Sequence, residues 1–209
     1  EAIGGFGHLE ELESGTAKVV FVPKDSRGPR LISCEPLEYQ WIQQALGNKI
    51  REHLEKCPYT RGQVNFTDQG VNRDLALKAS IDQEMVTLDL KEASDRVSVK
   101  LVEELFAHCP DLLDALMATR STHTRLPDGK VVQLNKFAPM GSNLCFPVEA
   151  FVFFALAVAV IVTRDLEARP IRSKCKDYFS LCKSRVKRAC KRVFVYGDDL
   201  ILHREDYAA

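Results

Sequence analysis

The sequence predicts an α+β fold, in which antiparallel strand pairs are combined with helices. Three hairpin patterns and two long apolar helix patterns carry this prediction. The hairpins are expected at 19–33, 122–134 and 193–202, and the helices at 37–56 and 145–162. With 209 residues, 45% of them hydrophobic and 28% charged, the chain has enough apolar surface for one domain or two subdomains.

The first half of the chain begins with two β-prone runs, at 19–22 and 31–33, on either side of a basic turn. Apolar residues then recur at helical spacing over 37–56, and this stripe, Trp41 included, is expected to be core. A short helix is expected at 73–80.

The second half alternates strands, turns and helices. The apolar run at 150–162 has about 13 residues, fewer than the roughly 20 that span a bilayer, so a buried helix is expected. The other elements are expected as a strand at 85–89, a polar turn at 90–97, helices at 99–107 and 110–119, strands at 122–126 and 130–134, and an amphipathic helix over the sheet within 171–192.

Charge is unevenly distributed along the chain, although the formal net charge is +0. Residues 1–15 carry four Glu and no Lys or Arg, whereas residues 164–192 carry eleven Lys and Arg against three acids. Neutrality of the whole chain therefore hides a basic segment. Two interpretations stay open for it: a solvated cationic face, or a contact with a nucleic-acid backbone.

The seven cysteines include no C-x-x-C pair and show no zinc-ligand spacing. We expect reduced, mostly buried thiols in a cytoplasmic setting. The N-terminal residues show no signal-peptide pattern. Because the chain lacks an initial Met and ends soon after the last predicted strand, it is expected to be part of a longer protein.

A tight hairpin turn is predicted at Tyr196, Gly197, Asp198 and Asp199, between two short β-prone runs. Gly197 permits a positive φ there. Two adjacent carboxylates repel each other unless a cation lies between them, and hard oxygen ligands suit Mg²⁺ or Mn²⁺. The alternative is an ordinary polar turn. A metal site also needs a further carboxylate.

Asp89 provides that further carboxylate, at the C-terminal end of the strand at 85–89. A strand that ends in Asp before a turn and a helix directs the carboxylate toward a cleft. A helix N-cap is the alternative role for such polar residues, and Ser94, Asp95 or Ser98 can fill it. Asp89 lies too early in the chain to cap that helix, which favours a functional role.

Two other segments suit a nucleotide. Lys24, Arg27 and Arg30 on the first hairpin can converge on one anion, since cationic side chains on a loop suit phosphate; a solvated hairpin tip is the equal alternative. Ser142 and Asn143 in a small polar loop are expected either to cap the following helix or to contact substrate.

In this order the motifs resemble the palm of an RNA-directed RNA polymerase, and most closely the replicase β subunit of the single-stranded RNA bacteriophages, the leviviruses. The resemblance runs from about residue 22 to 202. The matching segments are 22–30 with Glu35-Pro36 (a basic triphosphate-binding motif), 89–95 (the first metal motif), 140–143 (the template and ribose loop) and 196–199 (the second metal motif).

This resemblance implies a right-hand polymerase palm, an antiparallel sheet backed by helices. Residues 1–84 would be a fingers-like portion and 85–209 the palm, with the thumb absent. Lys91 and Glu92 depart from the family, which more often has small residues there, and they are expected to point outward. The next palm strand, with its lysine as candidate general acid, does not follow residue 209.

The resemblance also implies nucleotidyl transfer with two Mg²⁺, or Mn²⁺, held by Asp89 and Asp198, with Asp199 in support. It implies an RNA template and product, nucleoside triphosphates, host translation factors and the cytoplasm of a bacterial host, without a membrane. The nucleotide-binding residues that it implies are Lys24, Arg27 and Arg30 for the triphosphate, Ser94, Asp95 and Asn143 for the ribose, and Ser142 in the same loop.

Two alternatives remain at this point. A reverse transcriptase shares the palm and a Tyr-x-Asp-Asp turn, but it usually has an aromatic gate residue where this chain has 93–95, whose polar side chains favour ribonucleotides. A non-catalytic, palm-like RNA-binding module is the alternative from a different class. The clustered acids at Asp89, Asp198 and Asp199 argue against it, because unmatched like charges are costly to retain.

Overall fold

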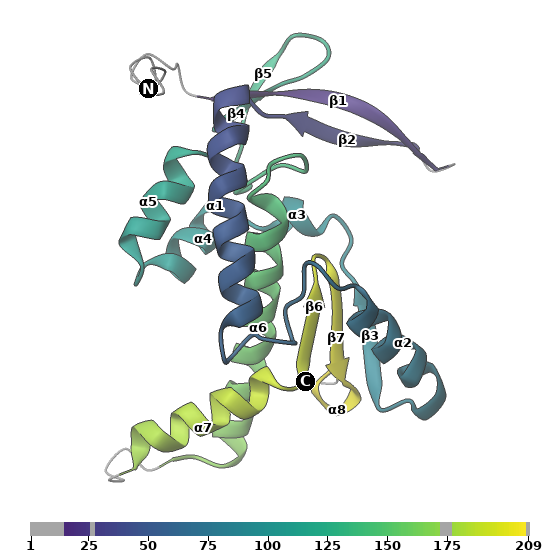
Figure 1. Cartoon of the computed structure of the whole chain (residues 1–209), viewed down its shortest axis with the longest axis vertical. Helices are drawn as coiled ribbons and strands as arrows, with labels where there is room; N and C mark the ends of the chain where they lie inside the picture. The colour runs from purple at the N-terminus through teal and green to yellow at the C-terminus, as the bar shows by residue number, and fades with distance from the viewer. Residues whose placement is uncertain (1–14, 26–27, 172–176, 208–209) are drawn as a thin grey trace, which may run out of the picture. The chain divides into compact units, whose positions relative to one another are not determined.

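The computed structural model describes residues 15–25, 28–171 and 177–207. The chain forms two compact units (Figure 1). Unit 1 comprises Glu1–Leu46 and Ser94–Cys145, and unit 2 comprises Gly47–Ala93 and Phe146–Ala209. Each unit therefore takes two separate segments of the chain. The division into a fingers-like portion at 1–84 and a palm at 85–209 follows other boundaries, and it stays a prediction.

Unit 1 contains a four-stranded sheet in the order β2-β1-β4-β5. Its strands are β1 (Thr16–Asp25), β2 (Gly28–Cys34), β4 (His123–Arg125) and β5 (Val131–Gln133). Both hairpins predicted in this part of the chain are confirmed, with longer strands in the first. The sequence did not predict that β1 and β4 pair in parallel and join the two hairpins into one sheet.

Short helices complete unit 1: α3 (Ala93–Arg96), which starts at the boundary between the units, α4 (Val99–Phe106) and α5 (Pro110–Ala118). Ser98 is the N-cap of α4, because its side chain accepts a hydrogen bond from the Leu101 amide at 3.2 Å. The four-residue α3 lies within the region predicted as a polar turn. The core of this unit includes Val102, Leu116, Phe137 and Leu144, all buried.

Helix α1 (Leu37–Lys56) has the predicted bounds but not the predicted buried face. Trp41 is 62% exposed and Leu37 is 77% exposed, so the expectation that they are core is wrong. The buried face instead carries Gln43, Ile50 and Leu54. At 3.6 residues per turn, residues 37 and 41 lie more than 90° around the helix axis from residues 43 and 50. The buried face with Gln43 and Ile50 is therefore turned away from the exposed face with Leu37 and Trp41.

Helix α6 (Cys145–Ala168) is 24 residues long and extends further than predicted. By length and composition alone it is long and apolar enough to cross a bilayer, so the expectation that it is too short for this is wrong. Half of its most apolar stretch is buried within the chain, including Val152 and Phe154, as the predicted buried helix requires. Leu156 and Val160 remain exposed.

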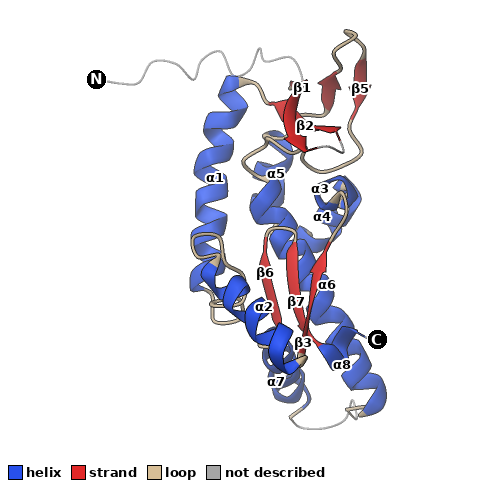
Figure 2. Cartoon of the chain, turned by 90° about the vertical axis from the view of Figure 1, so that its right-hand side faces the viewer, coloured by secondary structure: helices blue, strands red, loops and turns tan. Residues whose placement is uncertain are grey.

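Unit 2 contains a three-stranded antiparallel sheet in the order β3-β7-β6 (Figure 2). Its strands are β3 (Met85–Asp89), β6 (Val193–Tyr196) and β7 (Asp199–His203). It also contains α2 (Gly70–Asp82), α7 (Tyr178–Cys190) and α8 (Arg204–Tyr207), with the C-terminal half of α1 and all of α6 after Cys145. Helix α2 packs against β3 and β7. The predicted hairpin at 193–202 is confirmed, and Val193, Val195 and Leu200 anchor it in the core.

The cysteines in the described part of the chain are all free thiols, as predicted, but only Cys145 and Cys190 are buried, so the expectation that most of them are buried is wrong. Burial raises the pKa of the Cys190 thiol, which keeps it protonated and unreactive. Cys175 lies outside the described residues.

Candidate active site

The sheet of unit 2 brings Asp89 and Asp199 together, although they are far apart in the sequence. In the antiparallel pair β3–β7, Asp89 lies directly opposite Asp199, at the end of a continuous register from Met85 opposite His203. Directly opposed residues place their side chains on the same face, with Cβ atoms about 5 Å apart. The β3–β7 register thus brings Asp89 beside Asp199. The assignment of Asp89 and Asp198 as the two metal ligands stays a prediction.

Asp198 lies in the two-residue loop between β6 and β7, beside Asp199. Tyr196 pairs with Asp199 across this loop, and Gly197 has a φ of 63°. A positive φ at the first central residue, supplied by glycine, is typical of tight two-residue hairpins. All three carboxylates are exposed at one end of the sheet. The predicted turn is confirmed.

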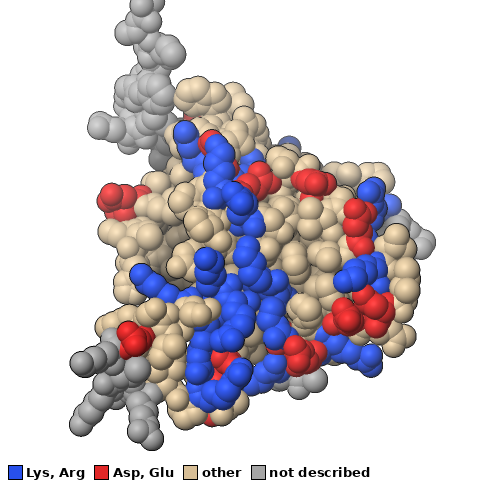
Figure 3. Space-filling model, turned by 60° about the horizontal axis from the view of Figure 1, so that its bottom comes forward, with Lys and Arg blue, Asp and Glu red and all other residues tan. Residues whose placement is uncertain are grey.

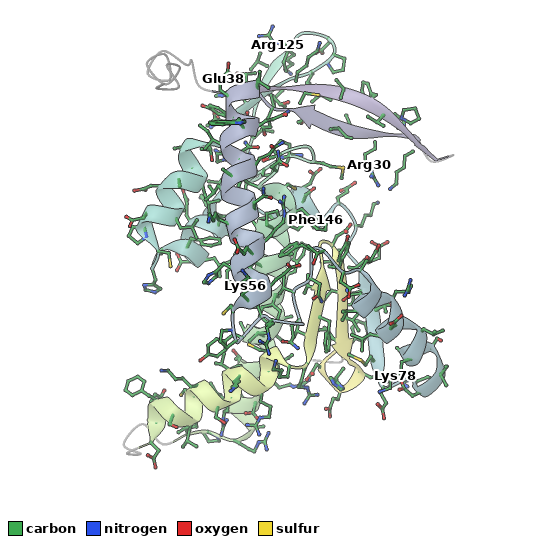
Figure 4. The ribbon with its side chains drawn as sticks, viewed as in Figure 1. Arg30, Glu38, Lys56, Lys78, Arg125 and Phe146 are labelled. Carbon is green, nitrogen blue, oxygen red and sulfur yellow. The ribbon has the colours of Figure 1, made fainter. Side chains whose placement is uncertain are left out.

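Gly197 is also required by its surroundings. A Cβ built on this residue would lie 2.0 Å from Cε2 of Phe146. Phe146 makes edge-on contacts with Phe66, at 5.8 Å between ring centroids, and with Tyr196, at 5.6 Å. Figure 4 labels Phe146 near the tip of the hairpin. The rings of Phe146, Phe66 and Tyr196 thus pack around the turn and support it. Phe146 was not predicted as a site residue, because its position in the sequence follows no recognisable motif.

The electrostatics of this turn favour a cation. The pKa of Asp199 is raised above its ordinary value, first by desolvation and then by the charges of Asp198 and Asp89. Although the Asp199 side chain is exposed, its carboxylate is partly shielded from water, and Asn72 Nδ2 donates to the Asp199 carbonyl oxygen at 3.4 Å. A divalent cation would relieve this repulsion, and hard oxygen ligands suit Mg²⁺.

Among the described residues, no group of three or more His, Cys, Asp or Glu side chains is close enough to hold a metal ion. Asp89, Asp198 and Asp199 supply the donor chemistry of a divalent site and interact electrostatically. A hollow lined by α1 and the loop after it includes none of these acids, so it is not the catalytic centre; its lining residues are Asn48, Arg51, Glu52, Glu55, Lys56, Phe66 and Thr67.

Asp199→Asn is expected to stabilise the metal-free protein at neutral pH. Because the folded-state pKa of Asp199 is raised, its charge costs stability once the pH rises above the range of a free carboxylate. Removing one member of an opposed like-charge pair is worth roughly 0.2–1 kcal/mol, at the low end because the site is solvated. Thermal unfolding between pH 3 and 8, with and without Mg²⁺, measures the effect.

The gain should vanish in acid, and Mg²⁺ should stabilise the parent more than the variant. Asp114→Asn, on an exposed position of α5, is the matched control and should change neither dependence. A variant with the same Mg²⁺ response as the parent would contradict a metal role for Asp199.

The turn that follows β3 has an unusual backbone. Lys91 and Glu92 are exposed, as expected. Glu92 has a φ of 54°, in the left-handed region that costs a residue with a Cβ about 1–2 kcal/mol. Glycine at this position would relieve that strain, because it has no Cβ.

The predicted nucleotide-binding residues all belong to unit 1, and the three carboxylates all belong to unit 2. Lys24 and Arg30 are exposed on the β1–β2 hairpin, where Arg30 lies opposite Val22 (Figure 4). Arg27 lies outside the described residues. Two exposed cations on one hairpin are compatible both with phosphate binding and with a solvated hairpin tip, the two alternatives for this segment.

The loop before α6 is fixed to β2 by backbone contacts. The Ser33 amide donates to the Met140 carbonyl oxygen at 2.8 Å. Gly141 has a φ of 116°, and a Cβ on it would lie 2.2 Å from the Ser33 carbonyl oxygen. Only glycine fits this close approach between two backbones, so the loop conformation depends on Gly141.

Gln43 fixes the same loop from α1, and its side chain is completely buried. Its Nε2 donates to the Thr119 carbonyl oxygen at 2.7 Å. Its Oε1 accepts from Ser142 Oγ at 3.0 Å and from the Asn143 amide at 3.3 Å. The Ser142 hydroxyl also accepts from the Leu144 amide at 3.3 Å. Ser142 is therefore buried and engaged within the loop, and a nucleotide contact through its hydroxyl would require breaking the bond to Gln43.

Asp95 and Ser94 lie in α3 with different surroundings. Ser94 is buried, whereas Asp95 is exposed and pairs with Lys136 Nζ at 2.5 Å. This ion pair links α3 to the segment that follows β5 and restricts the orientation of the Asp95 carboxylate. Lys136 was missed by sequence reasoning, since it is 41 residues away in the chain.

A buried charge cluster supports the same region. Glu35, at the end of β2, accepts a short hydrogen bond from Ser121 Oγ, and burial raises its pKa against the lowering effects of Ser121 and Arg120. The buried Arg120 donates to backbone carbonyl oxygens within 134–137 at 2.9–3.2 Å. Glu35, predicted as part of a triphosphate motif, thus lies at the base of the hairpin as a structural residue.

The chain belongs to a protein family described as RNA replicase, beta-chain, because the sequence model of that family matches residues 9–169. That range includes Asp89 and Asn143 but ends before the turn at Gly197. The resemblance found in the sequence is thereby confirmed at the level of the family.

Among individual relatives, the chain is similar to the RNA-directed RNA polymerase subunit beta of Escherichia virus Qbeta, with 33% identity over 185 residues, which are 88% of this chain and 26% of that protein. Its identity to the corresponding subunit of Enterobacteria phage SP is 34% over 88% of this chain and 27% of that protein. Its identity to the RNA-directed RNA polymerase beta chain of Escherichia phage MS2 is 31%, over an alignment that covers 68% of this chain and 24% of that protein. The chain spans about a quarter of the length of these relatives.

Proposed function

We propose that this chain is the palm-containing part of an RNA-directed RNA polymerase that copies a phage RNA genome by nucleotidyl transfer. The observation that carries the proposal is the register that sets Asp89 opposite Asp199, beside Asp198 in the hairpin loop. A palm needs acids on adjacent strands of an antiparallel sheet, and β3-β7-β6 is such a sheet. Membership of the replicase family supports the same activity.

In this mechanism Asp89 and Asp198 hold two divalent cations, and Asp199 supports them through its charge. When bound, Mg²⁺ or Mn²⁺ would lower the pKa of the primer 3′-hydroxyl and neutralise the negative charge of the leaving pyrophosphate. The loop with Gly197 fixes the distance of Asp198 from β3. Asp89 keeps its place through the β3–β7 register.

For the nucleotide, we propose that Lys24, Arg27 and Arg30 neutralise the triphosphate, with Arg offering a bidentate fork. Asp95 and Asn143 hydrogen-bond the ribose 2′-hydroxyl, which distinguishes ribonucleotides from deoxyribonucleotides. Lys136 orients Asp95, and Gln43 positions the backbone of Asn143. Ser142 holds its loop in shape through its hydrogen bonds to Gln43 and to the Leu144 amide, and Ser94 is buried beside Asp95.

The partners of the full polypeptide follow from this activity. They are an RNA template, an RNA product and nucleoside triphosphates, and we include host translation factors among them. The relatives come from bacteriophages, so the proposed setting is the cytoplasm of an infected bacterium.

Asp95→Ala in the full-length polymerase is expected to reduce discrimination against deoxynucleotides by about 10- to 100-fold. This is the size of a lost hydrogen bond to a charged group, about 1.5–3 kcal/mol. Primer extension with ribonucleotides and deoxynucleotides in parallel measures the ratio of kcat/KM values. The same assay on the parent separates an RNA polymerase from a reverse transcriptase, which would favour deoxynucleotides.

Asp114→Ala is the control, since it removes an exposed acid from α5 in the same unit. Its selectivity should equal that of the parent. Unchanged selectivity of Asp95→Ala would remove Asp95 from the ribose site.

A further inference from the structure

In the described part of the basic segment at 164–192, the arginines bind acids of the chain and the lysines do not. Arg185, on α7, donates from Nη1 to the Asp165 carbonyl oxygen at 3.0 Å and lies 3.2 Å from its carboxylate. Arg169 pairs with the same carboxylate, and Arg188 lies 4.0 Å from it. Because Asp165 belongs to α6, these contacts fix α7 to α6, and they lower the pKa of Asp165 against desolvation.

The other two arginines that the structure describes in this segment bind a second acid. Arg164 Nη2 and Arg192 Nε each lie 2.7 Å from the carboxylate of Asp206, which is 1% exposed. Arg192 also pairs with Glu205. The arginine charges in the described part of this segment are therefore used inside unit 2, as buried acids require.

The lysines of α7 and its C-cap lie on the opposite side. Lys183, Lys187 and Lys191 are spaced by four residues, which places them on one face of the helix, and all three are exposed. None pairs with an acid among the described residues. Lys191 Nζ donates instead to the neutral amide of Gln63 at 3.0 Å, which brings the loop with exposed Arg61 beside the end of α7.

Figure 3 shows Lys and Arg side chains gathered in a broad area on the face that carries α7. Like charges on one surface repel each other and favour an anion of repeating charge. Lys183 and Lys191 are eight positions apart, which is about 12 Å at the rise of an α-helix and the length of a few phosphates along one nucleic-acid strand. Lysine is a mobile point charge that suits backbone phosphates without reading the bases.

An aromatic side chain lies at the start of the same helix. Phe179 is 81% exposed, and its ring meets that of Tyr178 edge-on at 5.6 Å between centroids. Exposed aromatic rings beside a cationic surface bind unpaired bases by stacking. A protein partner fits less well, because lysine is depleted in protein interfaces.

We propose that the lysine face of α7, defined as Lys183, Lys187 and Lys191 with the neighbouring Arg61, binds the phosphate backbone of single-stranded RNA. This surface shares no residue with the carboxylate turn. It holds template or product without regard to sequence, and it keeps the RNA attached while nucleotides are added. The inference rests on the proposed polymerase function, since that function supplies the RNA.

The test uses full-length polymerase carrying Lys183→Gln and Lys187→Gln, two exposed changes that spare the bond between Lys191 and Gln63. Binding of fluorescent single-stranded RNA is followed by anisotropy over a salt series. Each lost phosphate contact lowers the slope of log K against log salt by about 0.7, so the slope should fall by about 1.4. Affinity should fall equally for RNAs of different sequence.

Lys100→Gln with Lys130→Gln removes the same charge from exposed positions of unit 1 and is the control. An unchanged salt slope in the α7 variant, or an equal change in the control, overturns the proposal. Displacement of the RNA by polyglutamate at an equal concentration of charge also overturns the proposal, because the surface would then bind an acidic protein as readily as RNA. Incorporation by the α7 variant at saturating RNA separates this surface from the catalytic function, which Asp198→Asn tests alone.

Discussion

Asp198→Asn in the full-length polymerase is expected to abolish Mg²⁺-dependent nucleotide incorporation, with a loss of at least about a thousandfold. A metal ion contributes several kcal/mol to stabilising the charge of the transition state, and each 1.36 kcal/mol is a factor of ten in rate. Asp198 is exposed in a two-residue loop, where Asn is well tolerated, so the fold should be retained. Single-turnover incorporation across a Mg²⁺ titration gives the rate and the metal dependence.

Asp114→Asn provides the control for the loss of one surface carboxylate. Circular dichroism and RNA binding of Asp198→Asn should match the parent, which separates loss of chemistry from loss of structure. If Asp198→Asn retained incorporation within tenfold of the parent, the assignment of the turn as the catalytic centre would be rejected.

Gly197→Ala is expected to reduce incorporation by at least about a hundredfold without removing any carboxylate. Alanine at a φ of 63° costs about 1–2 kcal/mol, and its Cβ would lie 2.0 Å from Phe146 Cε2. Phe66 and Tyr196 restrict the ring of Phe146, so part of the clash is relieved by displacing the turn. A shift of about 1 Å in a catalytic group costs about a hundredfold in rate.

Gly129→Ala is the matched control, because Gly129 also has a positive φ, 86°, but a Cβ there would meet nothing within 4 Å. It carries the conformational cost without the clash and should keep full incorporation. The double variant Gly197→Ala with Phe146→Ala removes the ring, and its activity should exceed the product of the two single effects. Strictly multiplicative effects would show that the Phe146 ring does not position the turn.

Much of the fold follows from local patterns, and the errors arise where one pattern fits two faces. The apolar residues of α1 form two stripes, one with Leu37 and Trp41 and the other with Ile50 and Leu54. Periodicity detects both stripes but does not show which one is buried. Gln43 on the second stripe is polar and would be expected to be exposed, but it is buried and hydrogen-bonded to the Thr119 carbonyl oxygen.

The carboxylate turn could be predicted because its chemistry is local. Asp198 and Asp199 are adjacent, Gly197 specifies the turn, and a strand that ends in Asp89 needs only one register to face them. The supporting contacts could not be predicted, because Phe146 acts through long-range packing. The same applies to the pairing of Asp95 with Lys136, which depends on a contact between segments 41 residues apart.

Net charge was a poor guide to the basic segment, since it counts arginines and lysines alike. Arg185 and Arg192 are committed to buried or half-buried acids, whereas Lys183 and Lys187 are exposed. Which cations have acidic neighbours is decided by the position of α7 on α6, and this position is set by contacts that composition does not reveal.

The outer edge of β3 affects how the polypeptide has to be handled. Among the described residues β3 pairs with β7 alone, so one row of its backbone amides and carbonyls has no ladder partner. Its sequence, Met-Val-Thr-Leu-Asp, has strong β propensity. Such an edge recruits the equivalent strand of another molecule, so a sample of this segment alone is prone to self-association and precipitation at high concentration.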